Sequence, residues 1–326
     1  MLRIALALTF VLVSGPFLLT SCGGEQPGPA PAAAPAKDSG GLAPVSLGKG
    51  GTAPVAPVAP VAPAKAPAEP PKEADLLGKA ERTLSSPDEE ERAGVIEVLL
   101  SAKDRKAAGR IAEKMLGDEN DDIRALAAET IGKLEYTEGT TALRTLLARE
   151  SSALVRKAAL QSLYTLLGKT AVPDLLRAVD KDEDSAVRAM AARMIGDLAA
   201  PEAGDPLVAK MADEYDPDVR VALAEALRKI KPAKASGVLI EALEDQHVGV
   251  RTEAARALGE MKERKAVGPL VRVLSPDEDS QTLVAMLEAL AKITGNEVEY
   301  KENDEASQKQ AIEEWNVWWE EHQGEY

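Results

Sequence analysis

The sequence predicts an all-α fold in which about seven helix pairs stack into an α-solenoid, or superhelix. An arginine recurs at a nearly constant interval through residues 92–251, and fixed periods of this length are typical of solenoid proteins. Apolar residues follow each arginine at helical spacing, and no segment alternates in the manner of a β-strand. The recurring arginines are Arg92, Arg124, Arg156, Arg188, Arg220 and Arg251, separated by steps of 32, 32, 32, 32 and 31 residues.

Residues 1–21 predict a signal peptide. Arg3 precedes an apolar run over residues 4–13, a Gly-Pro pair interrupts the run, and small residues then lead to Cys22. The tetrapeptide LTSC (19–22) resembles the lipobox of bacterial lipoproteins. In that family the signal is cut before the cysteine, whose thiol carries a diacylglycerol, so the resemblance implies lipidation of Cys22. The alternative is an uncleaved membrane anchor, for which the run is short and broken.

Two further features bear on the subcellular location of the protein. Cys22 is the single cysteine of the chain, so it cannot form an internal disulfide. Gly23 follows it, and by the lipoprotein family's sorting rule the absence of Asp at this position favours the outer membrane. We therefore expect an exported protein that is lipid-anchored in the bacterial cell envelope, at the outer membrane, with the membrane face left open.

Residues 22–73 predict the lipidated cysteine and a disordered, Pro/Ala-rich linker. Proline recurs every third residue in APVAPVAPVAPAKAPAEPP (53–71), which matches the three residues per turn of polyproline II. Such a segment is a semi-rigid spacer, and ~50 residues at about 3.1 Å each could extend about 150 Å. Its simplest use is a tether, and the alternative is a ligand for proline-binding modules.

Residues 74–293 predict the repeats, each a first helix followed by the helix that carries the arginine. Val219, Leu223, Leu227 and Ile230 lie at i, i+4, i+8 and i+11, which keeps them on one side of a helix. The first helix carries two apolar residues at 13 and 9 positions before the arginine. These pairs are Leu175 and Val179, Leu207 and Met211, and Val238 and Ala242.

Capping residues mark the starts of the second helices. Asp184 and Asp216 lie four residues before their arginines and are predicted N-caps. Ser86 and Ser275 are each followed by Pro and, three residues on, by Glu, which matches a capping box with proline at the first helical position. A helix pair cannot bury its apolar face alone, so neighbouring pairs must stack.

These patterns resemble the HEAT-repeat family, and specifically its bacterial subgroup named after phycobilisome lyases. The resemblance is carried by AVPDLLRAV (171–179), AVGPLVRVL (266–274) and VRAMAARMIG (187–196). It implies a solenoid that binds other proteins. It also implies that each recurring arginine pairs with an acidic or capping residue in a turn, so that the six form a structural ladder. The alternative is a row of cations that binds anions.

Catalytic chemistry is not expected. Deoxyhypusine hydroxylase, a HEAT relative, binds iron through His-Glu pairs, but neither His247 nor His322 is followed by Glu. No motif residue of the phycobilin lyases can be matched. We therefore expect no catalytic residue, no metal and no cofactor, and the alternative is a HEAT-like lyase, an oxidoreductase-related enzyme or an accessory factor.

Two acidic runs alternate in the manner of calcium loops but lack the glycine of the sharp turn. They are Asp118, Asn120 and Asp122, and Asp180, Asp182 and Asp184. Both lead directly into a predicted helix, where acidic side chains stabilise the N-terminal dipole. We therefore expect helix caps rather than metal ligands.

The net charge argues against nucleic acid as a partner. The chain carries −15, and residues 74–326 carry −16, because Arg3 contributes +1 and the linker charges cancel. Such a field repels phosphate and favours basic or polar partners.

Residues 294–326 predict a polar loop and a C-terminal helix over 308–322. All three tryptophans lie there, at i, i+3 and i+4: Trp315, Trp318 and Trp319. The helix is expected to cap the open apolar end of the last repeat. The alternative is a recognition surface for peptide or glycan.

The leading interpretation is a non-enzymatic scaffold or adaptor lipoprotein that binds protein partners in the envelope through the concave face of the solenoid. A passive envelope spacer is a further alternative. The side chains expected on that face lie six residues after each apolar residue that precedes a recurring arginine. They are Glu129, Gln161, Arg193, Glu225 and Arg256, and the three tryptophans are added as candidates.

Substitution of Cys22 tests the lipobox. Cys22→Ala removes the thiol, so we expect loss of acylation and release or mislocalisation of the protein, because acyl chains supply the expected hold on the bilayer. Mass spectrometry of the N-terminal peptide and membrane fractionation measure both effects. Unchanged membrane retention of the variant would rule out the lipobox.

Overall fold

A computed structural model of the chain describes residues 72–276, 278–301 and 304–326, which belong to one compact unit. The predicted signal peptide, Cys22 and the linker up to residue 71 lie outside the described residues. Every regular element in the described ranges is helical, and α1 to α14 form seven consecutive pairs. The predicted all-α solenoid of about seven pairs is confirmed. Among the described helices, none combines the length and apolarity needed to cross a bilayer.

The helix bounds lie close to those that the periodicity predicts. The predicted repeats begin at residue 74 and end at 293, whereas α1 begins at Glu73 and α14 ends at Thr294. The pairs are α1 (Glu73–Thr83) and α2 (Glu89–Ser101), α3 (Arg105–Met115) and α4 (Asp121–Lys133), α5 (Thr140–Leu147) and α6 (Ala153–Leu167), α7 (Val172–Lys181) and α8 (Ser185–Asp197), α9 (Gly204–Asp213) and α10 (Pro217–Ile230), α11 (Ala235–Glu241) and α12 (Val248–Met261), and α13 (Val267–Val273) and α14 (Ser280–Thr294). Helix α15 (Glu305–His322) follows, and it begins three residues before the predicted start at 308.

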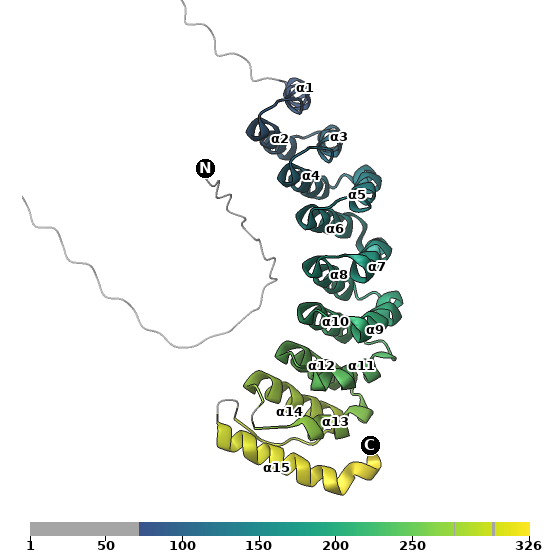
Figure 1. Ribbon diagram of the computed structural model, residues 1–326, viewed down its shortest axis with the longest axis vertical. Coiled ribbons are helices and arrows are strands. Elements are labelled where there is room, and N and C mark those ends of the chain that lie inside the picture. The colour runs from purple at the N-terminus through teal and green to yellow at the C-terminus, as the bar shows by residue number, and fades with distance from the viewer. Residues whose placement is uncertain (1–71, 277, 302–303) are drawn as a thin grey trace, which may run out of the picture. The chain divides into compact units, whose positions relative to one another are not determined.

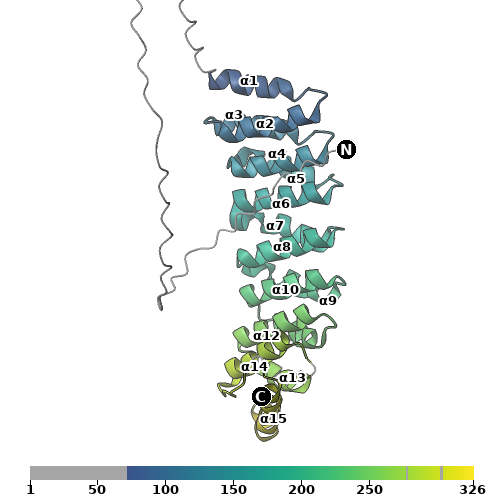
Figure 2. The same cartoon turned by 90° about the vertical axis from the view of Figure 1, so that its left-hand side faces the viewer.

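The pairs stack so that their helices form two layers (Figure 1, Figure 2). The first-helix layer contains the odd-numbered helices α1 to α13, and the second-helix layer contains the even-numbered helices α2 to α14. The predicted stripe of α10 faces the core, with Val219, Leu223 and Leu227 fully buried and Ile230 partly buried. Apolar area removed from water between the layers therefore supplies the main stabilisation.

The apolar pair predicted for α11 is half correct. Ala242 is buried as predicted, but Val238 is only partly covered, and the most buried residues are Leu239 in α11 and Leu243 in the turn of 3-10 helix that follows it (Ala242–Glu244). The step to Arg251 is 31 residues rather than 32, so one residue is missing between the buried face of α11 and its arginine. The buried positions consequently move one residue closer to the arginine.

The capping-box prediction is also corrected. Helix α2 begins at Glu89 with Asp88 as its N-cap, and α14 begins at Ser280 with Asp279 as its N-cap, rather than Ser86 and Ser275. Asp88 lies four residues before Arg92, which is the offset at which Asp184 caps α8 and Asp216 caps α10, as predicted. The N-cap therefore follows the register of the repeat rather than the local capping box.

Glycine sets the distance between second helices. Gly196 lies eight residues after Arg188, and a Cβ added to it would stand 2.8 Å from the Cα of Ala226 in α10. Gly259 occupies the equivalent place in α12, where a Cβ would stand 2.7 Å from the Cα of Ala289 in α14. No real Cβ fits at such distances, so only glycine allows these helices to pack backbone against backbone.

Tyr164 replaces that glycine in α6. Helix α6 packs far less extensively against α8 than α8 does against α10. The buried residues accordingly form two core clusters, which meet at α6: one contains Leu163 and the other contains Leu160. We call this weakly packed junction between α6 and α8 the α6/α8 seam.

Gly196→Ala tests the close packing of second helices. The new Cβ would overpack the contact with Ala226, so we expect a loss of about 1–2 kcal/mol in unfolding free energy, measured by urea denaturation. Gly237 in α11 is the matched control, because a Cβ there meets nothing within 4 Å. Gly237→Ala should raise stability by about 0.5–1 kcal/mol through helix propensity alone. Equal gains in both variants would contradict the packing argument.

An arginine ladder and a candidate interaction surface

Each recurring arginine binds a carboxylate of the next repeat through two nitrogens. The guanidinium Nε and Nη2 donate to the two oxygens of one acidic side chain, the geometry in which arginine and carboxylate interact most strongly. The acidic residue lies in the loop between the first and second helices of the following pair. The pairs are Arg92 with Asp118, Arg124 with Glu150, Arg156 with Asp182, Arg188 with Glu214, Arg220 with Asp245, and Arg251 with Glu278.

The link between Arg188 and Glu214 is the most buried. Arg188 Nε lies 3.0 Å from Glu214 Oε2, and Nη2 lies 2.9 Å from Oε1. Their side chains are 3% and 0% exposed. Arg188 Nη1 donates to two backbone carbonyls, those of Asp182 at 2.9 Å and Glu183 at 3.1 Å. The guanidinium thus joins the turn before its own helix to the turn before the next second helix.

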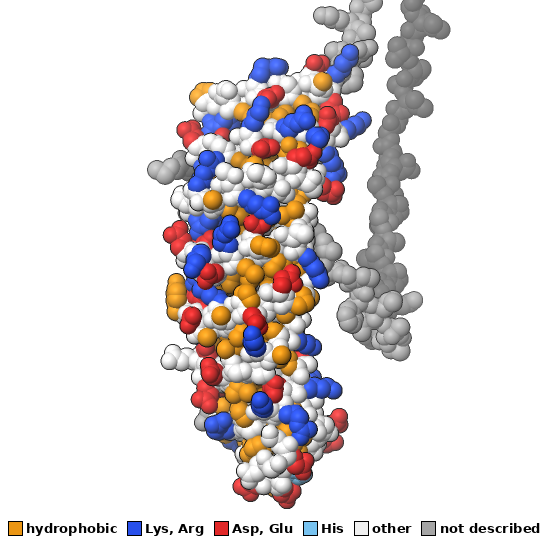
Figure 3. Space-filling model, turned by 90° about the vertical axis from the view of Figure 1, so that its right-hand side faces the viewer, with side chains coloured by type: hydrophobic (Ala, Val, Ile, Leu, Met, Phe, Trp, Pro, Cys, Tyr) orange, Lys and Arg blue, Asp and Glu red, His pale blue; other side chains and the backbone are white. Residues whose placement is uncertain are grey.

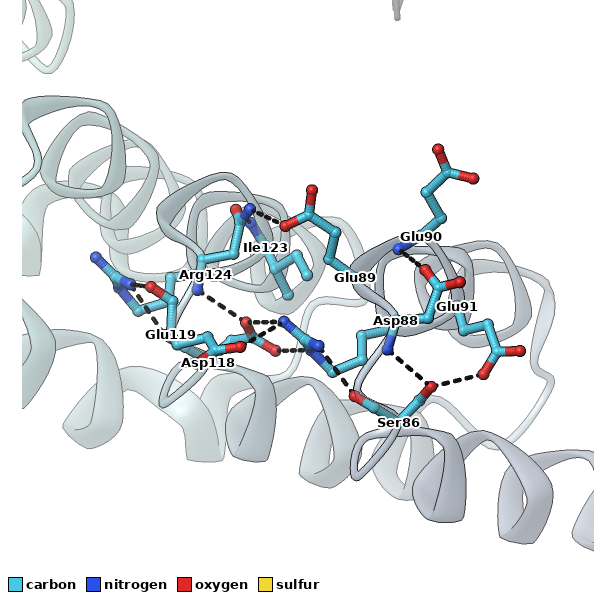
Figure 4. Close-up of polar contacts among 11 residues, drawn as sticks. Ser86, Asp88, Glu89, Glu90, Glu91, Asp118, Glu119, Ile123 and Arg124 are labelled. Carbon is cyan, nitrogen blue, oxygen red and sulfur yellow. Dashed lines mark hydrogen bonds and ion pairs between the residues drawn. The ribbon is translucent and has the colours of Figure 1, made fainter. Parts of the chain in front are cut away.

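Five of the six acidic residues, all except Glu278, are bonded to two successive arginines, which makes the ladder continuous. Figure 4 shows the surroundings of Asp118. Its carboxylate accepts from Arg92 at 2.8 and 3.0 Å and from the Asn120 N–H at 2.9 Å. Its backbone carbonyl accepts from Nη1 of Arg124 at 2.9 Å. The same arrangement recurs at Glu150, Asp182, Glu214 and Asp245, so every internal turn is bonded to two successive arginines.

The candidate partner-binding residues occupy one position in successive second helices, from α4 to α12. Arg193 of α8 donates to Glu225 of α10 at 3.0 Å, and Arg256 of α12 donates to Glu253 of its own helix at 2.7 Å. Glu129 pairs with Lys133 at 3.0 Å, and Gln161 is exposed. Unlike the ladder, these contacts change from repeat to repeat and remain at the surface.

A model of HEAT repeats matches residues 80–164, 165–228 and 236–301, which together are well over half of the chain. The chain belongs to the HEAT-repeat family. No curated protein matches it. Solved structures similar to it include YibA of Escherichia coli, at 20% identity and a TM-score of 0.48 over 77% of this chain and 99% of that one.

Two other solved HEAT-like structures are enzymes by their descriptions. The CpcE–CpcF complex of phycocyanin lyase from Nostoc sp. PCC7120 is 21% identical, covering 78% of this chain and 99% of that one, with a TM-score of 0.38. Human deoxyhypusine hydroxylase in complex with glycerol is 17% identical, covering 76% and 97%, with a TM-score of 0.36. Likeness at this level concerns the fold, and activity does not follow from fold.

The HEAT ladder occupies the groups that the alternative interpretations would need. All three nitrogens of each guanidinium donate within the ladder, so a row of arginines free to bind anions is not available. Asp118 and Asp182 of the alternating acidic runs each hold an arginine, and Asn120 and Asp184 cap α4 and α8. In the described ranges no three His, Cys, Asp or Glu side chains gather as a metal site would require.

The ladder also shifts the acidity of its carboxyl groups. The hydrogen bond from Arg124 lowers the pKa of Glu150 against the opposing effect of burial, and the Ser152 N–H adds to the lowering. At Glu214, burial would raise the pKa, yet hydrogen bonds from Arg188, from the Asp216 N–H and from Lys210 hold it below its ordinary value. These carboxyls are therefore ionised in the folded protein, and their negative charge is part of the HEAT architecture.

The acidic partners were missed at the level of sequence, although a signal for them exists. Each lies six residues before the next recurring arginine. The five that fit this rule are Asp118, Glu150, Asp182, Glu214 and Asp245. Their identity alternates between Asp and Glu, so the pattern appears only when the repeats are aligned on the arginines.

Helix α15 covers the end of the last HEAT repeat, which confirms the predicted capping helix. Trp315 is 1% exposed and packs in the core with Ala311 and Ile312. The prediction that Trp315 contacts a partner is therefore wrong, because a terminal solenoid face must be covered. Trp318 and Trp319 are partly exposed, and Trp319 lies against Gly268 of α13, where a Cβ would come within 2.9 Å of the indole.

Arg188→Ala tests the ladder. It leaves the buried Glu214 without its bidentate partner, so we expect a loss of about 1.5–3 kcal/mol in unfolding free energy, typical of a charged hydrogen bond. Arg193→Ala is the control, since its pair with Glu225 is at the surface and should contribute only about 0–1 kcal/mol. Urea denaturation measures both. Equal losses would contradict a ladder that carries the stability, and a stable Arg188→Ala protein that no longer binds its partner would favour an anion-binding role.

The depressed carboxyl pKa values predict acid sensitivity. The folded pKa of Glu150 and of Glu214 lies below the unfolded one, so their stabilisation is present above the unfolded value of about 4.3 and is lost as the pH falls through the folded value. We expect the melting temperature to fall below about pH 4.5 and the Glu214→Gln protein to show a shallower fall. Circular dichroism from neutral to acidic pH measures it, and a flat profile in the unmodified protein would contradict the argument.

Proposed function

We propose that this protein is a non-enzymatic scaffold that binds a protein partner through its second-helix layer while Cys22 anchors it to a membrane of the bacterial envelope. One observation carries the binding proposal. Side chains that differ in charge stand at the same position of five consecutive second helices, in Glu129, Gln161, Arg193, Glu225 and Arg256. A row of this kind gives each repeat one element of a sequence-specific contact, which stacked repeats can extend over a long surface.

The surface is suited to exchange of partners. The side chains of Arg193 and Glu225 are 47% and 29% exposed, so their mutual ion pair is weak and partly hydrated. A partner that offers opposite charges can replace such pairs at small cost, and complementary charges then determine which partner fits. HEAT repeats in general mediate protein interactions, which agrees with this role.

The anchoring proposal rests on the sequence before residue 72. A lipid on Cys22 holds the protein at the bilayer, and the Pro/Ala-rich linker separates the repeats from the membrane surface. Gly23, rather than Asp, follows the cysteine, and by the lipoprotein sorting rule this favours the outer membrane. The scaffold would thus capture its partner within the reach of its tether, which raises the effective concentration of that partner.

A charge-swap experiment tests the binding surface. The double variant Arg193→Glu with Glu225→Arg keeps the ion pair but reverses the pattern that a partner meets. We expect capture of the partner from detergent-solubilised envelopes to fall at least about tenfold, since like charges at an interface cost several kcal/mol. Quantitative mass spectrometry of the captured proteins measures the loss.

The matched control swaps an exposed ion pair of the first-helix layer, Asp205 with Lys234, which also joins neighbouring repeats. Asp205→Lys with Lys234→Asp should leave capture unchanged. Equal loss in both swaps would place binding elsewhere. Recovery of no specific protein by the unmodified chain, together with no envelope phenotype on deletion, would support a passive spacer instead.

A further inference from the structure

A cavity lies on the first-helix layer beside the α6/α8 seam and is lined by residues of α5, α6, α7 and the neighbouring loops. The space between α5 and α7 is about 470 Å³, within the range of about 300–1,000 Å³ that ligand sites occupy. Its apolar lining includes Leu147, Leu160 and Ala178. Figure 3 shows the first-helix face, over whose middle hydrophobic side chains gather among charged ones.

The carboxylates that line this cavity are already held by arginines. Three such pairs border it: Glu150 with Arg124, Asp174 with Arg144, and Asp182 with Arg156. Glu183 is exposed and lies 3.6 Å from Arg156. The negative charges of the lining are thus largely neutralised from within the repeat array, and they leave few acceptors for a basic ligand.

The lysine and arginine of α7 are more available. Arg177 is exposed and has neither an ion pair nor a side-chain hydrogen bond to any described residue. Lys181 is 77% exposed, and its partner at 3.1 Å is the adjacent Asp180, which is itself 61% exposed. Such a pair between neighbours is readily exchanged. The cavity therefore combines an apolar lining with two cations at its edge.

We propose that the cavity between α5 and α7 binds an acidic segment of a partner protein, with one apolar side chain in the cavity and carboxylates at Arg177 and Lys181. The proposal rests on the scaffold function and adds the chemistry of one partner segment. Local charge complementarity selects this occupant, because a basic segment would be repelled by Arg177 and Lys181.

Selection from random-sequence peptides displayed on phage tests the proposal with the full-length lipoprotein in detergent micelles. We expect enriched peptides that carry several Asp or Glu beside a Leu, Ile or Phe. Fluorescence anisotropy of the most enriched peptide then gives its affinity. Arg177→Glu and Lys181→Glu should each weaken that affinity at least about tenfold, because a like charge replaces an attractive one. Both side chains are exposed, so the fold should be retained, which circular dichroism verifies.

Lys265→Glu is the control, since Lys265 is an exposed cation of the first-helix layer in another repeat. The affinity of this variant for the peptide should stay within about twofold of that of the unmodified protein. Enrichment of basic or neutral peptides, no enrichment, or an affinity that neither Arg177→Glu nor Lys181→Glu changes would overturn the proposal. Concentration-dependent dimers that Arg177→Glu abolishes would also overturn it, since the acidic end of a second copy would then be the occupant.

Failure of this proposal can be told apart from failure of the scaffold function. If the unmodified chain captures an envelope protein but selects no acidic peptide, only the cavity assignment is wrong. If it captures no envelope protein, the scaffold function is wrong.

Discussion

The bidentate bond between an arginine of one repeat and a carboxylate of the next is the interaction on which this architecture depends. Its two ends lie in turns, where backbone carbonyls and N–H groups would otherwise be left without partners. One guanidinium satisfies carbonyls of its own turn and the carboxylate of the following turn, and that carboxylate accepts the N–H at the start of the next second helix. Because a buried charge is costly without its partner, neither member can be lost alone. The interval between arginines is therefore held close to 32 residues, and the repeats remain in register.

Packing between the second helices is less uniform than the ladder. Glycine at the eighth position after the arginine lets α8 pack closely against α10 and α12 against α14, whereas α6 packs less extensively against α8. The link between Arg156 and Asp182 nevertheless crosses this seam with both hydrogen bonds at 2.8 Å. Because the arginine–carboxylate bonds are the same in every repeat, the apolar packing between second helices can vary. The array keeps its continuity at a place where its core divides, and a cavity can form without separating the two halves.

Features that depend on contacts within one repeat could be predicted from the sequence, whereas features that depend on contacts between repeats were missed. Seven helix pairs, their buried stripes and the recurring arginines could be predicted, because each repeat restates the same local pattern. The acidic partners were not assigned, because they belong to the next repeat and vary between Asp and Glu, and their constant offset is visible only when the repeats are aligned on the arginines. The capping box at Ser86 failed because Asp88 caps α2 instead, while the Ser86 carbonyl accepts from Arg92 at 2.9 Å. The α6/α8 seam is a property of the contact between two repeats, which no periodicity within α6 reveals.

The difference between repeated and unrepeated charges separates structure from recognition in this chain. A charge that every repeat needs, such as Arg188, is buried, bonded through all its nitrogens and closed to a partner. A position whose charge changes from repeat to repeat, such as that of Arg193 and Glu225 among the second helices, contributes little to stacking and can vary without disturbing the ladder. Selection for a partner can therefore act on these positions freely, while selection for the fold acts on the arginines. In such a solenoid, the specificity for a partner resides in the surface positions whose residues differ between repeats.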